Sequence, residues 1–460
     1  MKRILYILAF FSLLQTSCTK FLQSEPYNNI SVDDIFKDFE GARTTVIGLY
    51  DNLRSTEYYM RLLSIYPELT GGNAIYTRSN NVILFDAYNF KNDFINNDMR
   101  PFYEQAYATI FAANTVLDNI DKAANASVLQ KNRLKADALC FRALAHFDLV
   151  KTFAQPYGFT DDASHQGVVL KLVNTNPLTP RSPRATVKQV YDAINADLDS
   201  AIQLYANSTF VYAFGDAKSY FSANAAKALK LRVALYSNNW NSVISLASEI
   251  IASNEYALVS RSSYINAWRG KAIHPESIFE LNYGNRIAES LGTFYNPLVV
   301  NSGGYIAVTA DLQNLFEPGD IRGSNGMLYT MVKDGNLHNF SRKYVGINDT
   351  ANNVKLLRMS EVWLSRAEAY AQINNFTAAL SDLNRVKQRA FVSYVPFQTN
   401  DKQLLLNEIF NERRRELNLE GHLLYDIART KRNVIRNNCL STICSFNYPN
   451  NNFACPIPLN

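Results

Sequence analysis

Apolar residues recur at alternating intervals of three and four along most of this chain, and this spacing constrains the fold more than any other feature. An α-helix turns once every 3.6 residues, so side chains at these intervals share one face and are buried together. The clearest examples lie at 103–121, 132–153, 187–201, 226–236 and 243–250. The sequence therefore predicts an all-α, mainly helical protein.

The best-defined helices form a pair between residues 357 and 390. Five residues stand at the relative spacing of the tetratricopeptide repeat: Trp363, Ala367, Tyr370, Ala379 and Leu383. In that repeat the small residues let two antiparallel helices approach closely, and the large ones fill the groove of the next pair. Because each pair covers the apolar face that its neighbour leaves open, we expect about four pairs in a superhelical scaffold.

Two long stretches with little helical period interrupt this pattern. The scaffold is expected to draw on three parts of the chain: 103–153, 187–253 and 357–430. Between them, residues 54–101 and 254–356 are rich in Asn, Gly, Tyr and Phe. Since long loops inside a compact protein are usually functional, we expect these stretches to form a second, irregular lobe. Both lobes are assigned to a single domain, 31–460.

The first residues have the pattern of an export signal. Lys2 and Arg3 precede an apolar run at 4–14, about half of the roughly 20 residues that a membrane-spanning helix needs. We therefore predict a signal peptide at 1–17. Small residues directly before Cys18 resemble the lipobox of bacterial lipoproteins, which implies an acylated Cys18. The alternative is a secreted protein in which this cysteine occurs by chance.

A polar stretch follows the predicted acylation site. We interpret residues 18–30 as a lipid anchor and tether, because several acyl chains give firm membrane attachment. Ser31, followed by Asp34, then marks the start of the first helix, since a serine hydroxyl accepts hydrogen bonds from backbone N–H groups.

Charge and motifs argue against several functions. The chain has 46 basic and 41 acidic residues, so its net charge of +5 gives no concentrated surface for phosphate, and no nucleic-acid partner is expected. The densest basic run, Arg413-Arg414-Arg415, lies between Glu412 and Glu416, and we interpret it as a solvated helix face.

No recognisable catalytic or metal-binding motif is present. The histidines are scattered without metal-ligand spacing, and neither His-Glu-x-x-His nor Gly-x-Ser-x-Gly occurs. We predict no catalytic residue, no metal and no cofactor. Paired carboxylates far apart in the chain, as glycoside hydrolysis uses, would escape such a search.

The cysteines after Cys18 fall into two groups. Cys140 lies among apolar residues of a helical stretch and is expected to be a buried free thiol. Cys439, Cys444 and Cys455 cluster near the C-terminus. In an exported protein two of them are expected to form a disulfide, and the sequence does not choose the pair.

Three segments follow one another along the chain: LRMSEVWL at 357–364 with RAEAY at 366–370, ERRREL at 412–417 with Glu420-Gly421, Asp426 and Arg429, and Pro456-Ile457-Pro458. Together they resemble the SusD/RagB family of outer-membrane nutrient-binding proteins. Further matches lie at 134–152, 184–205 and 276–280. We interpret the charged motif residues as structural, forming ion pairs and helix caps.

The resemblance implies a non-enzymatic protein of the outer membrane, facing the cell exterior beside a SusC-like TonB-dependent transporter. Such proteins capture a nutrient, commonly an oligosaccharide. Sugar capture needs aromatic faces for the rings and amide or guanidinium groups for the hydroxyls. The irregular stretches supply both, and the predicted ligand-binding residues are Asn73, Tyr76, Arg78, Tyr88, Phe90, Tyr283, Phe294 and Tyr295.

Three other functions remain open. A peptide ligand is possible because RagB-type members handle peptides. A glycan-active enzyme on a helical scaffold is a second alternative, and a repeat scaffold that binds only protein is a third. All three tryptophans, Trp240, Trp268 and Trp363, belong to expected helices or their edges. A sugar-binding surface would therefore rely on Tyr and Phe.

Overall fold

The computed structural model describes residues 31–78, 83–175, 182–269, 272–283, 291–298, 303–324, 326–344, 353–437 and 439–459. The predicted signal peptide, Cys18 and the tether therefore lie outside the described residues. Across the described ranges, no helix is both long and apolar enough to cross a membrane. The first helix, α2 (Val32–Ile35), begins as predicted, because the Ser31 hydroxyl accepts a hydrogen bond from the Asp34 N–H at 3.1 Å.

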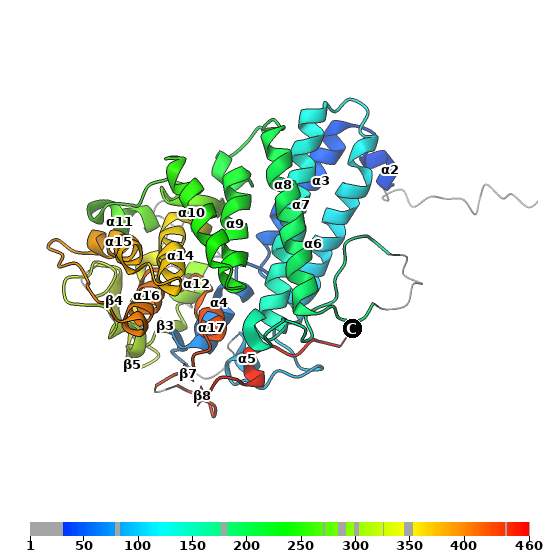
Figure 1. The fold of residues 1–460 in the computed structure, drawn as a ribbon. Coiled ribbons are helices and arrows are strands. Elements are labelled where there is room, and N and C mark those ends of the chain that lie inside the picture. Colours follow the sequence, from blue (N-terminus) through cyan, green and yellow to red (C-terminus); the bar gives the residue numbers. More distant parts are fainter. Residues whose placement is uncertain are drawn as a thin grey trace, which may run out of the picture.

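The main body is a series of helices that pack side by side in nearly the order of the chain (Figure 1). They are α3 (Phe39–Leu53), α6 (Arg100–Asn119), α7 (Val128–Phe153), α8 (Val187–Ala206), α9 (Ala223–Tyr236), α10 (Trp240–Ala252), α14 (Met359–Gln372), α15 (Phe376–Lys387) and α16 (Lys402–Glu416). From α6 to α10 each helix packs on the next, and α10 packs on α14, which also contacts α15 and α16. This arrangement confirms the mainly helical fold class.

Local sequence explains where these helices begin and which face they bury. Ser127 and Gln130 form a reciprocal capping box at the start of α7. Most of α7 is buried, because α6 and α8 both pack against it. In the predicted pair α14–α15, Ala367, Ala379 and Leu383 are fully buried in a shared core, with Trp363 and Tyr370 at its edge.

The second lobe is more regular than the sequence indicated. Its helices are α4 (Leu62–Gly71), α5 (Phe85–Tyr88), α11 (Arg261–Arg269), α12 (Leu291–Tyr295) and α13 (Ala310–Gln313). Its strands are β1 (Ala74–Tyr76), β2 (Ser277–Leu281), β3 (Ile306–Val308), β4 (Leu328–Lys333), β5 (Asn336–Ser341) and β6 (Val354–Arg358).

These strands form antiparallel sheets, one with the order β1-β3-β5-β4 and one of β2 with β6. The helix α4 escaped prediction for a physical reason. Every residue of α4 is buried, including the polar Ser64, Glu68 and Thr70, and Pro67 lies inside the helix, so the sequence does not distinguish a buried face from a solvent face. Near the C-terminus, α17 (Leu423–Arg429) packs on α4, and β7 (Val434–Ile435) pairs with β8 (Ser445–Phe446).

A buried cluster of ion pairs joins the two lobes. Arg322 contacts Glu412 at 2.5 Å and Glu416 at 3.0 Å, although it lies far from α16 in the sequence. Arg358 contacts Glu276, Glu416 and Glu420 at 3.2, 2.8 and 2.7 Å. The predicted structural role of these charged motif residues is confirmed.

The interpretation of the arginine run as a solvated face is wrong. Arg413 and Arg415 are buried, because acidic partners accompany them into the interior. Arg413 contacts Asp426 at 3.1 Å, and Arg415 contacts Glu412 at 2.8 Å. A buried charge is tolerated only when it is paired and hydrogen-bonded, and these partners meet that need.

Candidate functional site

A polar segment, residues 54–61, follows α3 and forms the edge of the candidate site. Its base is fixed because the hydroxyls of Tyr58 and Tyr59 both donate to Asp148, at 2.8 and 2.6 Å. The side chains of Arg54, Glu57 and Arg61 are half-buried. The segment therefore presents carboxylate and guanidinium groups on a rigid base.

Hydrogen bonds set the charge of the carboxylate in this segment. Ser55 and Thr56 donate to Glu57 at 2.6 and 2.8 Å, and Arg61 lies 3.4 Å from it. Although partial burial acts to raise it, these hydroxyls hold the pKa of Glu57 below its usual value. Glu57 is therefore ionised at neutral pH and accepts hydrogen bonds.

A cleft of about 290 Å³ opens where the end of α3, the loop 207–222 and the end of β2 meet. Arg54 lies on one side, Asn282 and Tyr283 lie on another, and Phe214 and Tyr220 complete the lining. The Phe214 ring is 82% exposed, which is unusual for so large an apolar side chain. The cleft thus combines aromatic surface with guanidinium and amide groups.

The aromatic side of the cleft is built as a stack. The rings of Tyr220 and Tyr212 are stacked nearly parallel with centroids 4.1 Å apart, and Phe210 meets both rings edge-on, at 5.7 and 5.5 Å. The Tyr220 hydroxyl donates to the carbonyl of Phe214 at 2.7 Å. Gly215, at φ +87°, supplies the left-handed turn that this closure requires.

A buried ion pair beneath the stack fixes its position. The Arg133 guanidinium lies 5.1–5.3 Å from the rings of Tyr205, Phe210 and Tyr212. Arg133 in turn contacts Asp137 at 3.2 Å, and the Tyr212 hydroxyl donates to the same carboxylate. The rings are therefore positioned before any ligand arrives, which lowers the entropy cost of binding.

A second group of side chains, in which Arg78 is exposed and Tyr305 is half-buried, continues from the other end of the polar segment. The Arg78 guanidinium lies over the ring of Tyr305 at 5.3 Å, and Phe294 meets that ring edge-on at 5.6 Å. The Thr77 N–H donates to the Tyr305 carbonyl at 2.9 Å, and its hydroxyl donates to Asp334 at 2.7 Å. Partial burial raises the pKa of Tyr305, so its hydroxyl stays protonated at neutral pH.

Most residues predicted to bind ligand are buried in this structure. Arg78 is exposed and Phe90 is half-buried. The buried ones are Asn73, Tyr76, Tyr88, Tyr283, Phe294 and Tyr295. Of these, Tyr283 lines the cleft and Phe294 supports Tyr305.

The other buried residues pack within the second lobe. Tyr76 and Tyr88 meet edge to face at 4.9 Å, and Tyr295 stacks on Tyr344 at 5.7 Å. Asn73 donates to Glu68 at 2.8 Å and accepts from Arg414 at 2.7 Å. Their direct contact with a ligand stays a prediction.

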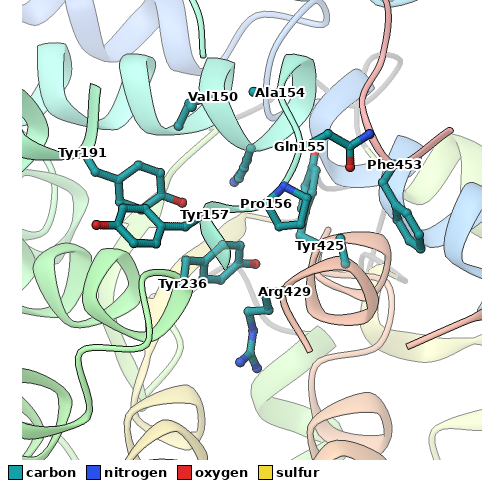
Figure 2. A pocket seen from close by; sticks show the side chains of 12 residues that line it. Val150, Ala154, Gln155, Pro156, Tyr157, Tyr191, Tyr236, Tyr425, Arg429 and Phe453 are labelled. Carbon is teal, nitrogen blue, oxygen red and sulfur yellow. The ribbon is translucent and has the colours of Figure 1, made fainter. Parts of the chain in front are cut away.

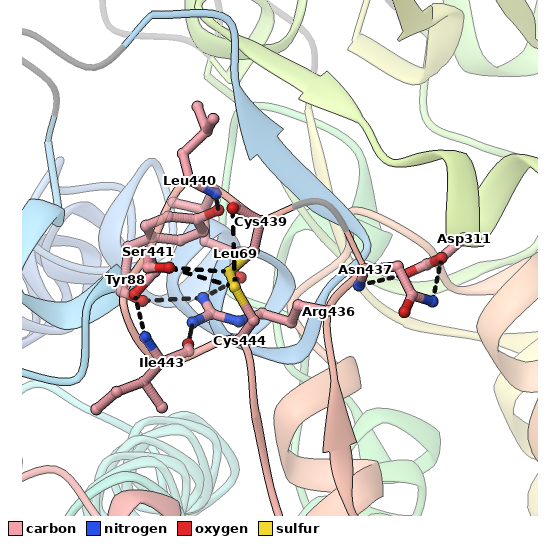
Figure 3. The surroundings of a disulfide bond; sticks show 10 residues. All are labelled: Leu69, Tyr88, Asp311, Arg436, Asn437, Cys439, Leu440, Ser441, Ile443 and Cys444. Atoms are coloured by element: carbon pink, nitrogen blue, oxygen red, sulfur yellow. Dashed lines mark hydrogen bonds between the residues drawn. A yellow bond between two sulfur atoms is a disulfide. The ribbon is translucent and has the colours of Figure 1, made fainter.

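A disulfide holds the chain beside Tyr88 (Figure 3). Cys439 and Cys444 form this bond, while Cys140 and Cys455 are buried free thiols, which confirms the expectation for Cys140. Beside the bond, Arg436 donates to the Tyr88 carbonyl at 2.9 Å, and Leu440 N–H donates to the Tyr88 hydroxyl at 3.1 Å. The bond thus supports the segment that carries Tyr88 and Phe90.

An interior pocket between α7, α8, α9 and α17 is too small to be the site. Figure 2 shows the rings of Tyr157, Tyr191 and Tyr236 gathered around it. Its volume is about 20 Å³, room for roughly one water molecule. Within the described parts of the chain, no cluster of His, Cys, Asp and Glu has the arrangement of a metal site.

The aromatic side chains that line the cleft from the loop 207–222 were missed from the sequence. Phe214 and Tyr220, with Phe210 packed beside them, lie in TFVYAFGDAKSYF, at 209–221, between two predicted helices. Alternating aromatic residues in a short loop after an amphipathic helix were the available signal. Exposed aromatic faces beside hydrogen-bonding groups suit a ligand with both apolar faces and hydroxyl or amide groups.

Comparison with known proteins covers most of the chain. Residues 20–235 match a family model described as starch-binding associating with outer membrane, and residues 321–452 match the model of the SusD family. The SusD-like protein P38 of Formosa agariphila is 22% identical over 484 residues, covering 91% of this chain and 89% of that protein.

Solved structures share the fold. A putative sugar binding protein from Bacteroides vulgatus has a TM-score of 0.80 and 26% identity, with coverage of 92% of this chain and 95% of that one. A SusD superfamily protein from Bacteroides thetaiotaomicron has a TM-score of 0.81 and 22% identity, covering 92% and 96%. The similarity therefore extends over both lobes.

Proposed function

This chain belongs to the SusD/RagB family of outer-membrane-associated binding proteins, and from that premise we propose that it captures an oligosaccharide in the cleft beside Phe214 and Tyr220. The observation that carries this proposal is the exposed Phe214 ring beside the preorganised stack of Tyr212 and Tyr220 at the edge of the cleft. A pyranose ring has an apolar C–H face that lies against an aromatic ring, and its hydroxyls meet the polar side chains alongside.

Two further groups extend the proposed binding surface. Arg54 and Asn282 offer hydrogen bonds inside the cleft, and Arg78 with Tyr305 offers a second platform beyond Arg61. A surface with platforms at both ends of the segment 54–61 suits a chain of several sugar units better than a single one. Single-site affinity need not be high, because tethering beside a transporter raises the effective concentration.

The proposed location follows from the N-terminus and the family. Acylation at Cys18 would hold the protein on the outer membrane, facing the exterior, with 18–30 as the tether. Delivery of the ligand to a SusC-like TonB-dependent transporter completes the proposal. In this role the protein binds and hands over its ligand without cleaving it.

A peptide ligand is the second candidate, and one observation favours it. Arg78 places an exposed guanidinium against Tyr305, and Arg61 also acts on that ring. A guanidinium pairs strongly with a carboxylate, including the C-terminus of a peptide. A carboxylate-bearing sugar would use the same group.

The direct test is a binding screen of purified residues 19–460 against soluble polysaccharides and peptides, by retardation in ligand-containing native gels and then calorimetry. Binding to one glycan class with no shortening of the glycan supports capture. Release of fragments that a single Asp or Glu substitution abolishes would instead establish an enzyme. Binding to peptides alone would select the second candidate.

Transport partnership needs a separate measurement. The full-length chain, expressed in its native outer membrane and purified with mild detergent, is expected to bring a TonB-dependent transporter with it. A Cys18→Ala variant is the matched control, because it removes only the acylated residue. A transporter that is absent from the full-length sample would contradict this part of the proposal.

A further inference from the structure

A separate pocket of about 150 Å³ lies at the end of the molecule where α5 meets the C-terminal segment (Figure 1). Tyr66 of α4 and Phe90 contribute its aromatic walls, and the amides of Asn92, Asn451 and Asn452 contribute its polar walls. It shares no lining residue with the cleft beside Phe214. A water molecule needs about 10–15 Å³, so this volume holds roughly ten waters or one sugar ring.

The hydroxyl of Tyr66 is the most informative atom of the pocket. Tyr66 is only 3% exposed, yet its hydroxyl makes no hydrogen bond to any described residue. The hydroxyl oxygen of Tyr66 is also not one of the fully buried polar atoms, so it is open to the pocket that Tyr66 lines. A hydroxyl that has no protein partner and opens onto a pocket is available to hydrogen-bond a polar ligand bound there.

The walls of the pocket are fixed by contacts to residues outside it and between its own lining residues. Phe90 meets Phe446 edge-on at 5.0 Å and has the Arg436 guanidinium at 4.7 Å. The Cys455 N–H donates to the Thr152 carbonyl at 2.8 Å, and Asn92 donates to the Cys455 sulfur at 3.4 Å. The pocket therefore needs little reorganisation to accept a ligand.

The chemistry of the lining selects the ligand class. No lining residue carries a charge, so an ionic ligand would lose its hydration without compensation. Two aromatic rings, three amides and one free hydroxyl instead match a ring with apolar faces and several hydroxyls. We propose that this pocket binds one neutral sugar unit, separately from the cleft. The inference does not rest on the proposed function, because it follows from the lining alone.

The test uses residues 19–460 and four free sugars as probes: glucose, galactose, mannose and N-acetylglucosamine. Saturation-transfer NMR detects binding, and its concentration dependence gives the affinity. Tyr66→Phe removes only the free hydroxyl and leaves every described contact of the fold in place. Loss of one neutral hydrogen bond predicts about fivefold weaker binding for Tyr66→Phe, and a similar loss for Asn452→Ala.

Two controls make the result specific to this pocket. Tyr295→Phe also removes a buried phenol hydroxyl, but one that lies outside the pocket, and it is expected to leave the affinity unchanged. Phe214→Ala alters the cleft and is also expected to leave the affinity for the free sugar unchanged. Absence of any signal from the four sugars, or a signal insensitive to Tyr66→Phe and Asn452→Ala, would overturn the inference. Failure of the proposed glycan capture by the cleft would appear separately, as absence of retardation in the polysaccharide-containing native gels.

Discussion

Replacing Arg358 by methionine tests whether the charged residues of the family motifs hold the fold or take part in binding. Arg358 is 2% exposed and donates to three carboxylates, those of Glu276, Glu416 and Glu420. Methionine has a similar length and no charge, so Arg358→Met removes the ion pairs while leaving most of the volume filled.

The expected loss of stability follows from what remains after the substitution. Breaking a buried ion pair from one side costs about 3–5 kcal/mol, because a charge is left without its partner. Here Glu416 keeps Arg322 and Arg389, Glu276 keeps Arg389, and Glu420 keeps Lys343 at 2.7 Å. Since no carboxylate is left alone, we expect a loss near the lower limit, about 3 kcal/mol.

The assay is urea unfolding at neutral pH, followed by circular dichroism. Arg43→Met is the matched control, since Arg43 pairs with an exposed Glu40 and such pairs contribute about 1 kcal/mol or less. A loss for Arg358→Met no larger than for Arg43→Met would refute the structural role. Loss of ligand binding by a fully folded Arg358→Met protein would also contradict it, because it would place the motif in the binding site.

Three further predictions concern acid, the disulfide and the loop of the cleft. Burial acts to raise the pKa of Glu361 and of Glu276, but nearby arginines lower both to about 2. Arg232 does so for Glu361, and Arg389 with Arg358 does so for Glu276. These carboxylates therefore stabilise the fold fully above about pH 5. The melting temperature should fall as the pH drops from about 4.3, the pKa of an unfolded glutamate, toward 2. A melting temperature that stays constant down to pH 3 would contradict this prediction. Reducing the Cys439–Cys444 disulfide removes the constraint on only a short loop, with a sequence separation of 5. The apparent free energy of unfolding should therefore drop by about 2 kcal/mol, as measured from urea midpoints with and without reductant. Gly215→Ala places a side chain at φ +87° and should cost about 1 kcal/mol and weaken glycan binding, whereas Gly335→Ala, at φ +81° in a β-hairpin, should cost as much without affecting binding.

The helical scaffold was predictable because its helices are buried on one face only. Ala367, Ala379 and Leu383 repeat at helical spacing, and the structure buries all three in the shared core of α14 and α15. The helix α4 was not predictable in this way, since its polar and apolar residues are all buried and Pro67 lies inside it. Strands β1 and β3 were missed because they pair from distant parts of the chain, as Ala74 and Val308 do, whereas β4 and β5 form a local hairpin around Asp334-Gly335 whose turn signal was overlooked.

Buried charges and aromatic residues were harder to place because their partners also lie far away in the sequence. A run such as Arg413-Arg414-Arg415 is usually solvated, and only long-range partners such as Asp426 reveal that two of these arginines are buried. Tyr76 and Tyr88 satisfied the composition of a sugar site but pack against each other. Phe214 was recognisable only once the loop 207–222 was seen to fold over the end of α3.

The measurement that tests the central claim most directly is calorimetry of the Phe214→Ala/Tyr220→Ala double variant with the glycan that the native gels identify. Each ring contributes about 0.5–1.5 kcal/mol by stacking, so the affinity should fall about tenfold or more while circular dichroism shows that the variant is folded at the assay temperature. Phe111→Ala is the control, because it removes a ring that is 60% exposed on α6, outside the cleft. Unchanged affinity in the double variant would show that the glycan binds elsewhere, and the assignment of the cleft would be wrong.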